Sequence, residues 1–226
     1  MEDMNILITG ISRGIGLGLA RKVLEEGHQV LGIARNPDTS SELRQLQSEY
    51  PQKLQVLALD LRSDNAASQI QTALKNVTHI DILINNAGIL DESTSKQSFL
   101  ESFEVNTYVP FMTTEALLPW LKKSSHPLAL HISSTMGSIS DNSSGGYYAY
   151  RSSKSALNMI NKSLSVDHHW LTTVVIHPGW VQTRMGGPAA TTPVEESVLG
   201  IWKVVKGLKH TDTGLFFDYR GNMLPW

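Results

Sequence analysis

The chain has 226 residues, a formal net charge of −2 and no cysteine. This near-neutral charge gives no reason to expect nucleic acid or an anionic membrane as a partner. The absence of cysteine excludes a disulfide framework, a thiolate metal site and a thiol nucleophile. No apolar run approaches the roughly 18–20 residues that a membrane span requires. We therefore expect a single domain, residues 1–226, that resides in the cytosol because no export signal precedes the first strand.

Strand and helix patterns alternate along the whole chain. Seven short apolar segments have the length and composition of strands. They are Asn5–Thr9, Gln29–Ala34, Leu54–Asp60, Asp81–Asn85, Leu128–Ser133, Thr173–His177 and Gly214–Asp218. Several are continuously apolar, which is typical of strands covered on both faces. The segments between them have helical periodicity, as in Ile15, Leu19 and Val23 at a spacing of four. The pattern predicts a doubly wound α/β fold, with about seven mostly parallel strands and helices on both faces.

A glycine-rich turn follows the first predicted strand and opens the first predicted helix. Its residues of interest are Gly10, Ser12, Arg13, Gly14, Ile15 and Gly16. The spacing departs from the G-x-G-x-x-G fingerprint, but the physical purpose is the same. Glycines allow a tight turn and let the backbone approach a phosphate at the positive end of a helix. A purely structural turn is the alternative, although the position between a strand and a helix favours phosphate binding.

Three further motifs follow, in the order Asn85–Gly88, Ile132–Ser134 and Tyr150-x-x-x-Lys154. A Tyr-x-x-x-Lys match alone carries little information, because roughly one tyrosine in sixteen has a lysine four residues later by chance. The glycine turn and these three motifs, in this order, resemble the short-chain dehydrogenase/reductase family over nearly the whole chain. The resemblance implies a Rossmann fold, an oxidoreductase activity and a homodimer or homotetramer.

By this resemblance Tyr150 and Lys154 are catalytic. They are four residues apart, so in a helix over Tyr147–His168 they share one face. A free tyrosine has a pKa near 10. We expect the Lys154 ammonium, together with the positive charge of an oxidised nicotinamide, to lower the pKa of Tyr150. Tyr150 would then exchange a proton with a carbonyl oxygen as hydride is transferred.

The resemblance adds Ser134 and Asn106 to the catalytic set. Ser134 would hydrogen-bond the substrate oxygen, and the neighbouring Ser133 is the rival for this role. Asn106 stands four residues before Pro110 in a helix-like stretch, residues 99–122. Because a proline ring collides with the carbonyl four residues back, we expect a kink and a free carbonyl that could hold a water molecule. An ordinary asparagine in a packing helix is the alternative.

The resemblance also places a dinucleotide cofactor along the carboxyl ends of the strands. Besides the glycine turn, the implied contacts are Arg35, Asp60, Leu61, Asn86, Ala87, Gly88, Tyr150, Lys154, Pro178, Gly179, Val181 and Thr183. Ala34 stands where an NAD enzyme of the family carries an acidic residue, and Arg35 follows it. Two arginines, Arg35 and Arg13, and no carboxylate at the end of the second strand favour binding of the 2′-phosphate of NADPH/NADP+. The alternatives are a solvated Arg35 and an Asp60 that caps a turn instead of contacting adenine.

Within the family, the sequence is similar to the Sniffer-type carbonyl reductases and to the bacterial C-factor (C-signal) proteins. The stretches that carry this similarity are 134–139, 145–150, 185–188 and 224–226. The similarity implies NADPH-dependent reduction of a small aldehyde or ketone, with a signalling or regulatory role as the alternative. An epimerase or dehydratase is a third reading, but such enzymes usually carry a larger C-terminal substrate domain. The histidines lack ligand spacing, so no metal site is expected.

Overall fold

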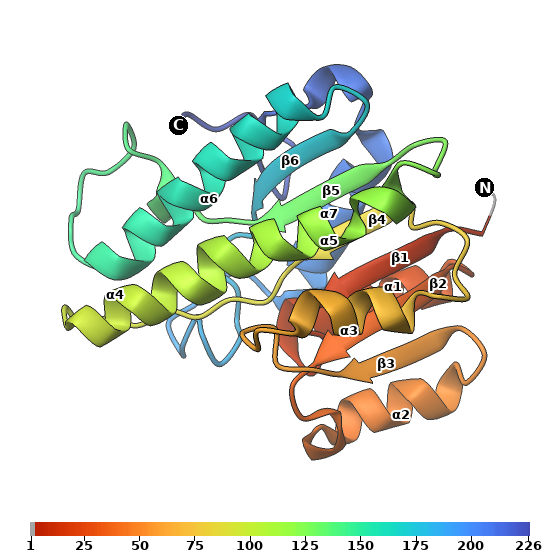
Figure 1. Ribbon diagram of the computed structural model, residues 1–226. Coiled ribbons are helices and arrows are strands. Elements are labelled where there is room, and N and C mark those ends of the chain that lie inside the picture. The colour runs from red at the N-terminus through yellow and green to blue at the C-terminus, as the bar shows by residue number, and fades with distance from the viewer. Residues whose placement is uncertain (1–2) are drawn as a thin grey trace.

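One seven-stranded parallel sheet forms the centre of the protein (Figure 1). The computed structural model describes residues 3–226. Its strands are β1 (Asn5–Thr9), β2 (Gln29–Ala34), β3 (Leu54–Ala58), β4 (Ile82–Asn85), β5 (Leu128–Ile132), β6 (Thr172–His177) and β7 (Phe216–Asp218). They are arranged in the order β3-β2-β1-β4-β5-β6-β7. The predicted doubly wound fold is therefore confirmed, with all seven strands parallel.

Helices cover both faces of this sheet. They are α1 (Gly14–Glu25), α2 (Ser41–Glu49), α3 (Ala66–Ala73), α4 (Lys96–Phe103), α5 (Val109–Leu121), α6 (Tyr148–Asp167) and α7 (Val194–Gly207). Apolar residues of α1, α2 and α7 form the core on one face, and those of α3 and α5 form the core on the other. Helices α4 and α6 lie on the same side as α5 (Figure 1). No helix within residues 3–226 has both the length and the apolar character needed to cross a membrane.

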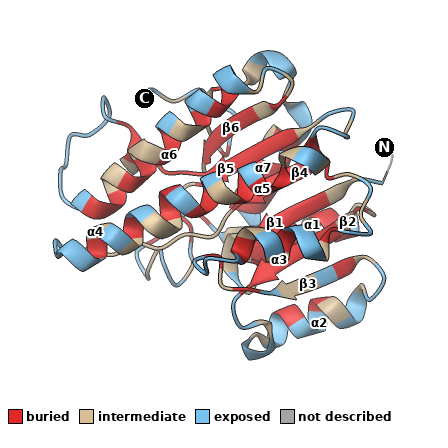
Figure 2. Cartoon of the chain, viewed as in Figure 1, coloured by how far each residue is buried: buried red, intermediate tan, exposed pale blue. Residues whose placement is uncertain are grey.

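Strands β1, β2, β4, β5 and β6 are buried along most of their length, whereas the edge strand β3 and the outer sides of the helices are partly exposed (Figure 2). In β1, the side chains of Ile6, Leu7 and Ile8 alternate between the two faces of the sheet, and all three are at most 1% exposed. Ile6 and Ile8 belong to the core on the α1 and α7 side, and Leu7 belongs to the opposite one. A continuously apolar strand is thus explained by helices on both sides.

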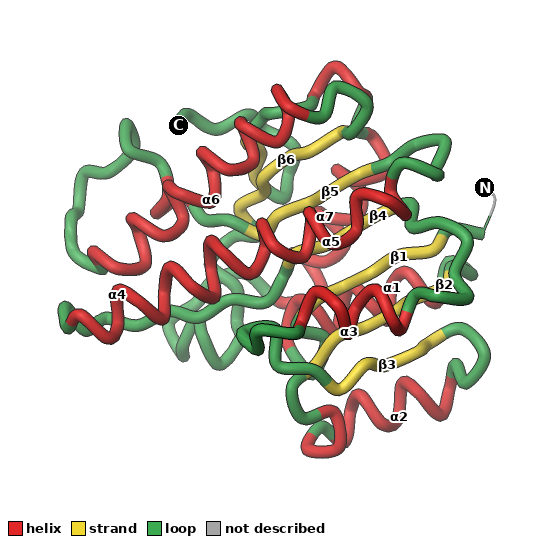
Figure 3. The backbone as a smooth tube through the Cα atoms, viewed as in Figure 1, coloured by secondary structure: helices red, strands yellow, loops and turns green. Residues whose placement is uncertain are grey.

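The loops that leave the carboxyl ends of the strands gather at one edge of the sheet (Figure 3). Strand β3 ends at Ala58, two residues before the predicted end at Asp60. The difference arises because Asp60 already belongs to a turn, in which its carbonyl accepts a hydrogen bond from the Ser63 amide. Strand β7 begins at Phe216, after the predicted Gly214, whose φ of 76° is incompatible with an extended strand.

Helices α4 and α5 form one long rod across the sheet (Figure 1), joined by a π-helical turn over Glu104–Tyr108. Pro110 lies in the first turn of α5. The sequence predicted an interruption at Asn106, and the structure has one there. It takes the form of a widened turn within a continuing rod and not of a sharp kink, since the wider turn accommodates the proline ring.

Candidate active site

A cleft of about 670 Å³ opens at the carboxyl ends of β1 and β4, where the strand order reverses. It brings together most of the residues that the sequence singled out. These are Gly10, Ser12, Arg13, Gly14, Ile15, Arg35, Asp60, Leu61, Asn86, Ala87, Gly88, Tyr150, Lys154, Pro178 and Thr183. Five others do not line the cleft and lie behind or beside it. They are Gly16, Asn106, Ser134, Gly179 and Val181.

The glycine-rich turn is interlocked with the end of β4. The Asn86 side-chain amide donates hydrogen bonds to the carbonyls of Thr9, at 2.9 Å, and of Gly10, at 3.2 Å. A Cβ atom at Gly16 would collide with the Gly10 carbonyl and with that same amide. Gly16 therefore serves this close packing, whereas Gly10, with a φ of 73°, makes the turn itself.

The start of α1 is suited to an anion. No side chain caps the helix: Arg13 occupies the N-cap position with extended backbone and forms no side-chain cap hydrogen bond. The first amide N–H groups of α1 therefore face the cleft together with the positive end of the helix dipole. Such a helix start next to a glycine turn fits the pyrophosphate of a dinucleotide.

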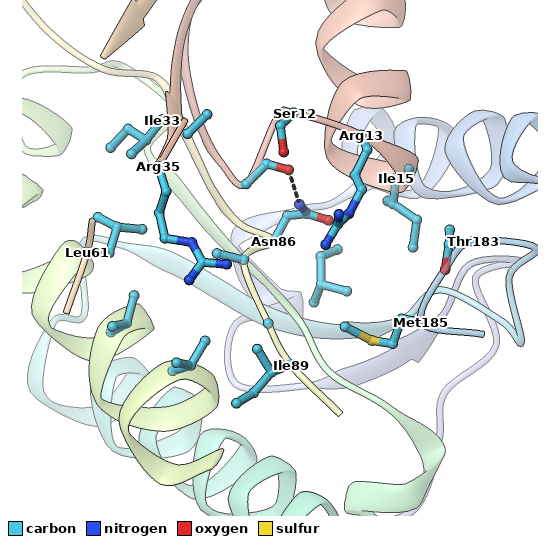
Figure 4. A pocket seen from close by; sticks show the side chains of 18 of the residues that line it. Ser12, Arg13, Ile15, Ile33, Arg35, Leu61, Asn86, Ile89, Thr183 and Met185 are labelled. Atoms are coloured by element: carbon cyan, nitrogen blue, oxygen red, sulfur yellow. Dashed lines mark hydrogen bonds between the residues drawn. The ribbon is translucent and has the colours of Figure 1, made fainter. Parts of the chain in front are cut away.

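Two arginines extend into the cleft beside this helix start. Arg13 lies between Arg35 on one side and Thr183 with Met185 on the other (Figure 4). Within residues 3–226, neither Arg13 nor Arg35 has a carboxylate partner. Burial lowers the pKa of Arg13, and the charges of Arg184 and Arg35 lower it further. Concentrated positive charge without a counter-ion fits a ligand that carries phosphates.

Asp60 closes a turn at the end of β3. Its carboxylate accepts hydrogen bonds from the Arg62 amide and Nε at 3.1 Å and from Nη2 at 2.8 Å. The Arg62 hydrogen bond holds the pKa of Asp60 below its usual value. The structure thus contains the turn-capping arrangement that the sequence left as an alternative, and the contact of Asp60 with adenine stays a prediction.

Tyr150 and Lys154 lie on one face of α6, as their spacing of four predicted. Both are buried, with exposed fractions of 7% and 4%. The Lys154 ammonium donates a hydrogen bond to the Ile132 carbonyl at 2.8 Å and lies 5.8 Å from the centroid of the Tyr150 ring. A main-chain carbonyl at the end of β5 therefore fixes the lysine beside the tyrosine.

The sequence predicted a lowered pKa for Tyr150 beside Lys154 and an oxidised nicotinamide. The groups of the protein alone do not lower it. Burial raises the pKa of Tyr150 to about 12, and a hydrogen bond with Ser134 offsets only part of this effect. Burial also lowers the pKa of Lys154 to about 8. Both shifts favour the neutral form, because burial shields both groups from water.

The two serines at the end of β5 differ in what their hydroxyls contact. Ser133 donates its hydrogen bond to the Asn158 side chain at 2.7 Å and is committed to packing against α6. The Ser134 oxygen accepts from the Met136 amide at 3.1 Å, which leaves its own hydrogen available. Ser133 lines the cleft but is occupied by Asn158, whereas Ser134 lowers the pKa of Tyr150 against the larger effect of burial, which favours Ser134 as the residue beside the reacting oxygen.

Asn106 is fully buried at the π-helical turn and holds the strand-end loop that follows Gly88. Its Oδ1 accepts from the Ile89 amide at 2.8 Å, and its Nδ2 donates to the Ile89 carbonyl at 2.9 Å. A Cβ atom at Gly88 would lie 3.2 Å from Asn106 Oδ1 and 3.7 Å from Lys154 Nζ. Gly88 thus leaves room for both side chains, and the water-holding role of Asn106 stays a prediction.

The segment after β6 is held rigidly. The Gln182 amide donates to the Thr192 carbonyl at 2.8 Å, and the Thr192 amide donates to the Trp180 carbonyl at 2.9 Å. These bonds pin Val181 against Thr192. Gly179 lies so close to Thr192 that a Cβ atom there would be 3.0 Å from its hydroxyl. The Pro178–Thr183 segment can therefore present its backbone at a fixed position.

Within residues 3–226, no three His, Cys, Asp or Glu side chains are grouped as a metal site requires.

A family model for short chain dehydrogenases matches residues 4–193. The chain belongs to this family. The C-signal protein of Myxococcus xanthus is 43% identical over 154 residues, which cover 65% of this chain and 93% of that protein. The family match confirms the resemblance predicted from the four motifs. The similarity to the C-signal protein confirms the C-factor similarity predicted from the other four stretches.

Solved structures agree with this family membership. The carbonyl reductase Sniffer of Drosophila melanogaster has a TM-score of 0.95 and 35% identity, with all of both chains covered. The NADPH-bound carbonyl reductase from chicken fatty liver has a TM-score of 0.92 and 33% identity, again over all of both chains. This short-chain dehydrogenase is therefore an oxidoreductase of the same fold as known carbonyl reductases.

Two arginines of this short-chain dehydrogenase were not singled out from the sequence. Arg151 donates hydrogen bonds to the Gly145 and Gly146 carbonyls at 3.0 and 3.2 Å and to the Ser144 hydroxyl at 2.8 Å. Arg184 lines the cofactor cleft. The one sequence signal for Arg151 was its place directly after Tyr150 and a few residues after a glycine–serine loop. Arg184 follows Thr183, and only the path of the loop brings it to the cleft.

Proposed function

We propose that this oxidoreductase is an NADPH-dependent carbonyl reductase, which reduces an aldehyde or ketone to an alcohol. The observation that carries the proposal is the buried Tyr150 next to Lys154, both of which line a cleft whose other end contains unpaired arginines. The known carbonyl reductases of the same fold, one of them bound to NADPH, support it.

The residues of the cleft have separate tasks in this proposal. NADPH, when bound, supplies the hydride that reaches the carbonyl carbon. The α1 N-terminus holds the pyrophosphate, and Lys154 holds the nicotinamide ribose. Tyr150 stays protonated at neutral pH because its pKa is about 12, and it gives its proton to the substrate oxygen. Ser134 donates a hydrogen bond to the same oxygen as negative charge develops there. Solvent returns the proton to Tyr150.

The decisive experiment is NADPH consumption with a panel of aldehydes, ketones, diketones and quinones, comparing wild type with Tyr150→Phe. Loss of the general acid should lower turnover by about 10²–10⁴-fold and leave NADPH affinity nearly unchanged. Tyr148→Phe is the matched control, because Tyr148 is exposed on the same helix and has no lysine four residues later. Retention of more than about a tenth of the wild-type turnover in Tyr150→Phe would contradict the assignment.

The cofactor preference is tested separately by the dissociation constants of NADPH and NADH. Arg35→Ala should weaken NADPH by about ten- to a hundredfold and hardly affect NADH, because a charged hydrogen bond contributes about 1.5–3 kcal/mol. Arg13→Ala should have a smaller effect on the same preference. Lys203→Ala, which removes an exposed charge outside the cleft, is the control. Equal weakening of both dinucleotides by Arg35→Ala would show that the 2′-phosphate is bound elsewhere.

A signalling role is the second candidate, and the 43% identity to the C-signal protein favours it. The two candidates differ in whether turnover is needed. If a deletion strain is rescued by wild type and equally by Tyr150→Phe, the biological role is independent of reduction. If only wild type rescues, reduction is the role. The reductase proposal expects the protein in the cytosol, which cell fractionation tests.

A further inference from the structure

Four arginines line the cofactor cleft; Arg62 is paired with Asp60, and one of the other three has no role in the proposal above. These three come from the glycine turn (Arg13), the end of β2 (Arg35) and the loop after β6 (Arg184). Within residues 3–226 none of the three has a side-chain hydrogen bond or an ion pair. The other five arginines all have such a partner; they are Arg21, Arg44, Arg62, Arg151 and Arg220. Unpaired guanidinium groups are thus confined to the cleft.

Arg184 belongs to a tight turn that lies against the start of α1. The Thr183 hydroxyl accepts a hydrogen bond from the Gly186 amide at 3.2 Å, and the Thr183 carbonyl accepts one from the Gly187 amide at 3.1 Å. A Cβ atom at Gly14 would lie 3.2 Å from Thr183 Cγ2. The backbone that carries Arg184 is therefore fixed beside the first residue of the helix.

The positions of the arginines assign them to different parts of a dinucleotide. Arg35 follows β2, on the side of the cleft where Asp60 and Leu61 also lie. Thr183 and Met185, the chain neighbours of Arg184, lie on the opposite side of Arg13 (Figure 4). Besides burial, the charges of Arg184 and Arg35 both lower the pKa of Arg13, and the contact of Thr183 with Gly14 holds the backbone of Arg184 near the helix start. Positive charges held this close repel one another, and an anion between them removes that repulsion.

We propose that Arg184 closes the cleft over the cofactor pyrophosphate, which is then held between the α1 N-terminus and the Arg184 guanidinium. Arg35 binds the 2′-phosphate and does not share this task. The inference rests on the proposed use of a nicotinamide dinucleotide. It does not depend on the choice between NADPH and NADH, because both contain the pyrophosphate.

The test measures binding of four ligands to wild type and to Arg184→Ala by calorimetric or fluorescence titration. NADPH, NADH and ADP-ribose contain the pyrophosphate, whereas 2′-AMP contains the 2′-phosphate without it. Arg184→Ala should weaken the first three by a similar factor, about five- to twentyfold, and leave 2′-AMP unchanged. Arg184→Lys should restore part of the loss, because a lysine keeps the charge without the two-pronged geometry.

Two controls make the result specific. Arg35→Ala should show the opposite pattern, with weaker NADPH and 2′-AMP and unchanged ADP-ribose, and Lys203→Ala should change none of the four. An Arg184→Ala variant that loses NADPH and 2′-AMP but not ADP-ribose would show that Arg184 binds the 2′-phosphate, and the proposal would be wrong. Unchanged binding of all four ligands would also overturn it.

The outcome separates this inference from the proposed function. If wild type binds NADH at least as tightly as NADPH, the NADPH preference fails, and the ADP-ribose comparison still decides the role of Arg184. If wild type binds no dinucleotide and no ADP-ribose, both proposals fail together. Because Arg184 is exposed, its variants should keep the melting temperature of wild type, which confirms that binding and not folding is measured.

Discussion

Tyr150 and Lys154 are buried in surroundings that favour the neutral form of each. With a pKa of about 12, Tyr150 holds its proton throughout the neutral range. Lys154, with a pKa of about 8, is charged at pH 7 at an energetic cost. A protonated tyrosine is the form needed to protonate a substrate oxygen. The burial that raises the pKa of Tyr150 therefore suits the proposed reduction. The same burial destabilises the folded protein, because it also surrounds the charged Lys154.

That cost has a defined pH dependence. Burial lowers the pKa of Lys154 from its ordinary 10.5 to about 8. Between these values the unfolded chain binds a proton that the folded protein does not, so the free energy of unfolding rises with pH across this window. Below pH 8 the full cost is present, about 3 kcal/mol at most. Lys154→Met removes it, so this variant should gain more stability relative to wild type at pH 7 than at pH 10.

Urea unfolding of wild type and Lys154→Met gives the stability difference between the two proteins at pH 7 and at pH 10, and these two differences are then compared. Lys203→Met is the control, because Lys203 is exposed and should give the same difference at both pH values. At pH 10 a tyrosine of the unfolded chain is about half ionised, which acts in the opposite direction for Tyr150, but both proteins contain Tyr150 and the effect cancels in the comparison. A Lys154→Met difference that is the same at both pH values would mean that the lysine is not destabilised by burial.

A side chain of α6 makes several hydrogen bonds to the loop that precedes this helix. Arg151 donates to the Gly145 and Gly146 carbonyls and to the Ser144 hydroxyl, and α6 then begins directly after Tyr147, whose φ is 49°. A left-handed backbone at a tyrosine is strained, and it persists only where its surroundings hold it. Arg151 therefore positions the loop at the entrance to Tyr150.

Arg151→Ala should raise the KM for the carbonyl substrate about three- to tenfold, with a smaller change in kcat and an unchanged dissociation constant for NADPH. Loosening of the loop should also speed proteolysis within residues 141–147, a readout that does not depend on the substrate. Arg151→Lys should not restore the loop, since a lysine lacks the planar fork. Arg21→Ala, which breaks a surface ion pair with Glu49, is the control. Unchanged KM and unchanged proteolysis would contradict the positioning role.

The sequence predicted those features that local order determines. The glycine turn lies between a strand and a helix, and the Tyr150–Lys154 spacing matches one face of α6, so both could be placed without knowing any long-range contact. Residues whose position depends on the path of a loop, such as Arg151 and Arg184, could not be placed. The pKa of Tyr150 was also out of reach, because the depth of burial results from the packing of the whole chain around α6.

One group of exposed apolar side chains lies on the helices of one face of the molecule. The α4–α5 rod and α6 lie on the same side of the sheet (Figure 1). Large apolar residues on them remain exposed; they are Leu100, Phe103, Tyr108, Phe111, Met159 and Val166. Other apolar residues of these helices, such as Leu117 and Leu157, are buried within the chain. The remaining exposed group is of the kind that a second copy covers in symmetric dimers.

We expect a homo-oligomer built on this face, a dimer or a tetramer of the 24.9 kDa chain. Light scattering at micromolar concentration should give a multiple of the chain mass. The variant Leu100→Glu with Met159→Glu should give the mass of one chain, because charges would be buried without partners. Lys203→Glu, on the outside of α7, should leave the oligomer intact. A wild-type mass equal to that of one chain would contradict the prediction.

The interlock of Gly16 with Asn86 and the Gly10 carbonyl has a consequence for how this sequence can vary. Because a side chain at position 16 would displace the Asn86 amide and the turn together, the position is closed for reasons of packing. In a saturation library, substitutions at Gly16 should reduce the amount of folded protein in the cell. Substitutions at Arg35 should leave that amount unchanged and reduce only cofactor binding. An abundance screen alongside an activity screen would thus separate the positions of the nucleotide site that are needed for folding from those that are needed only for cofactor binding.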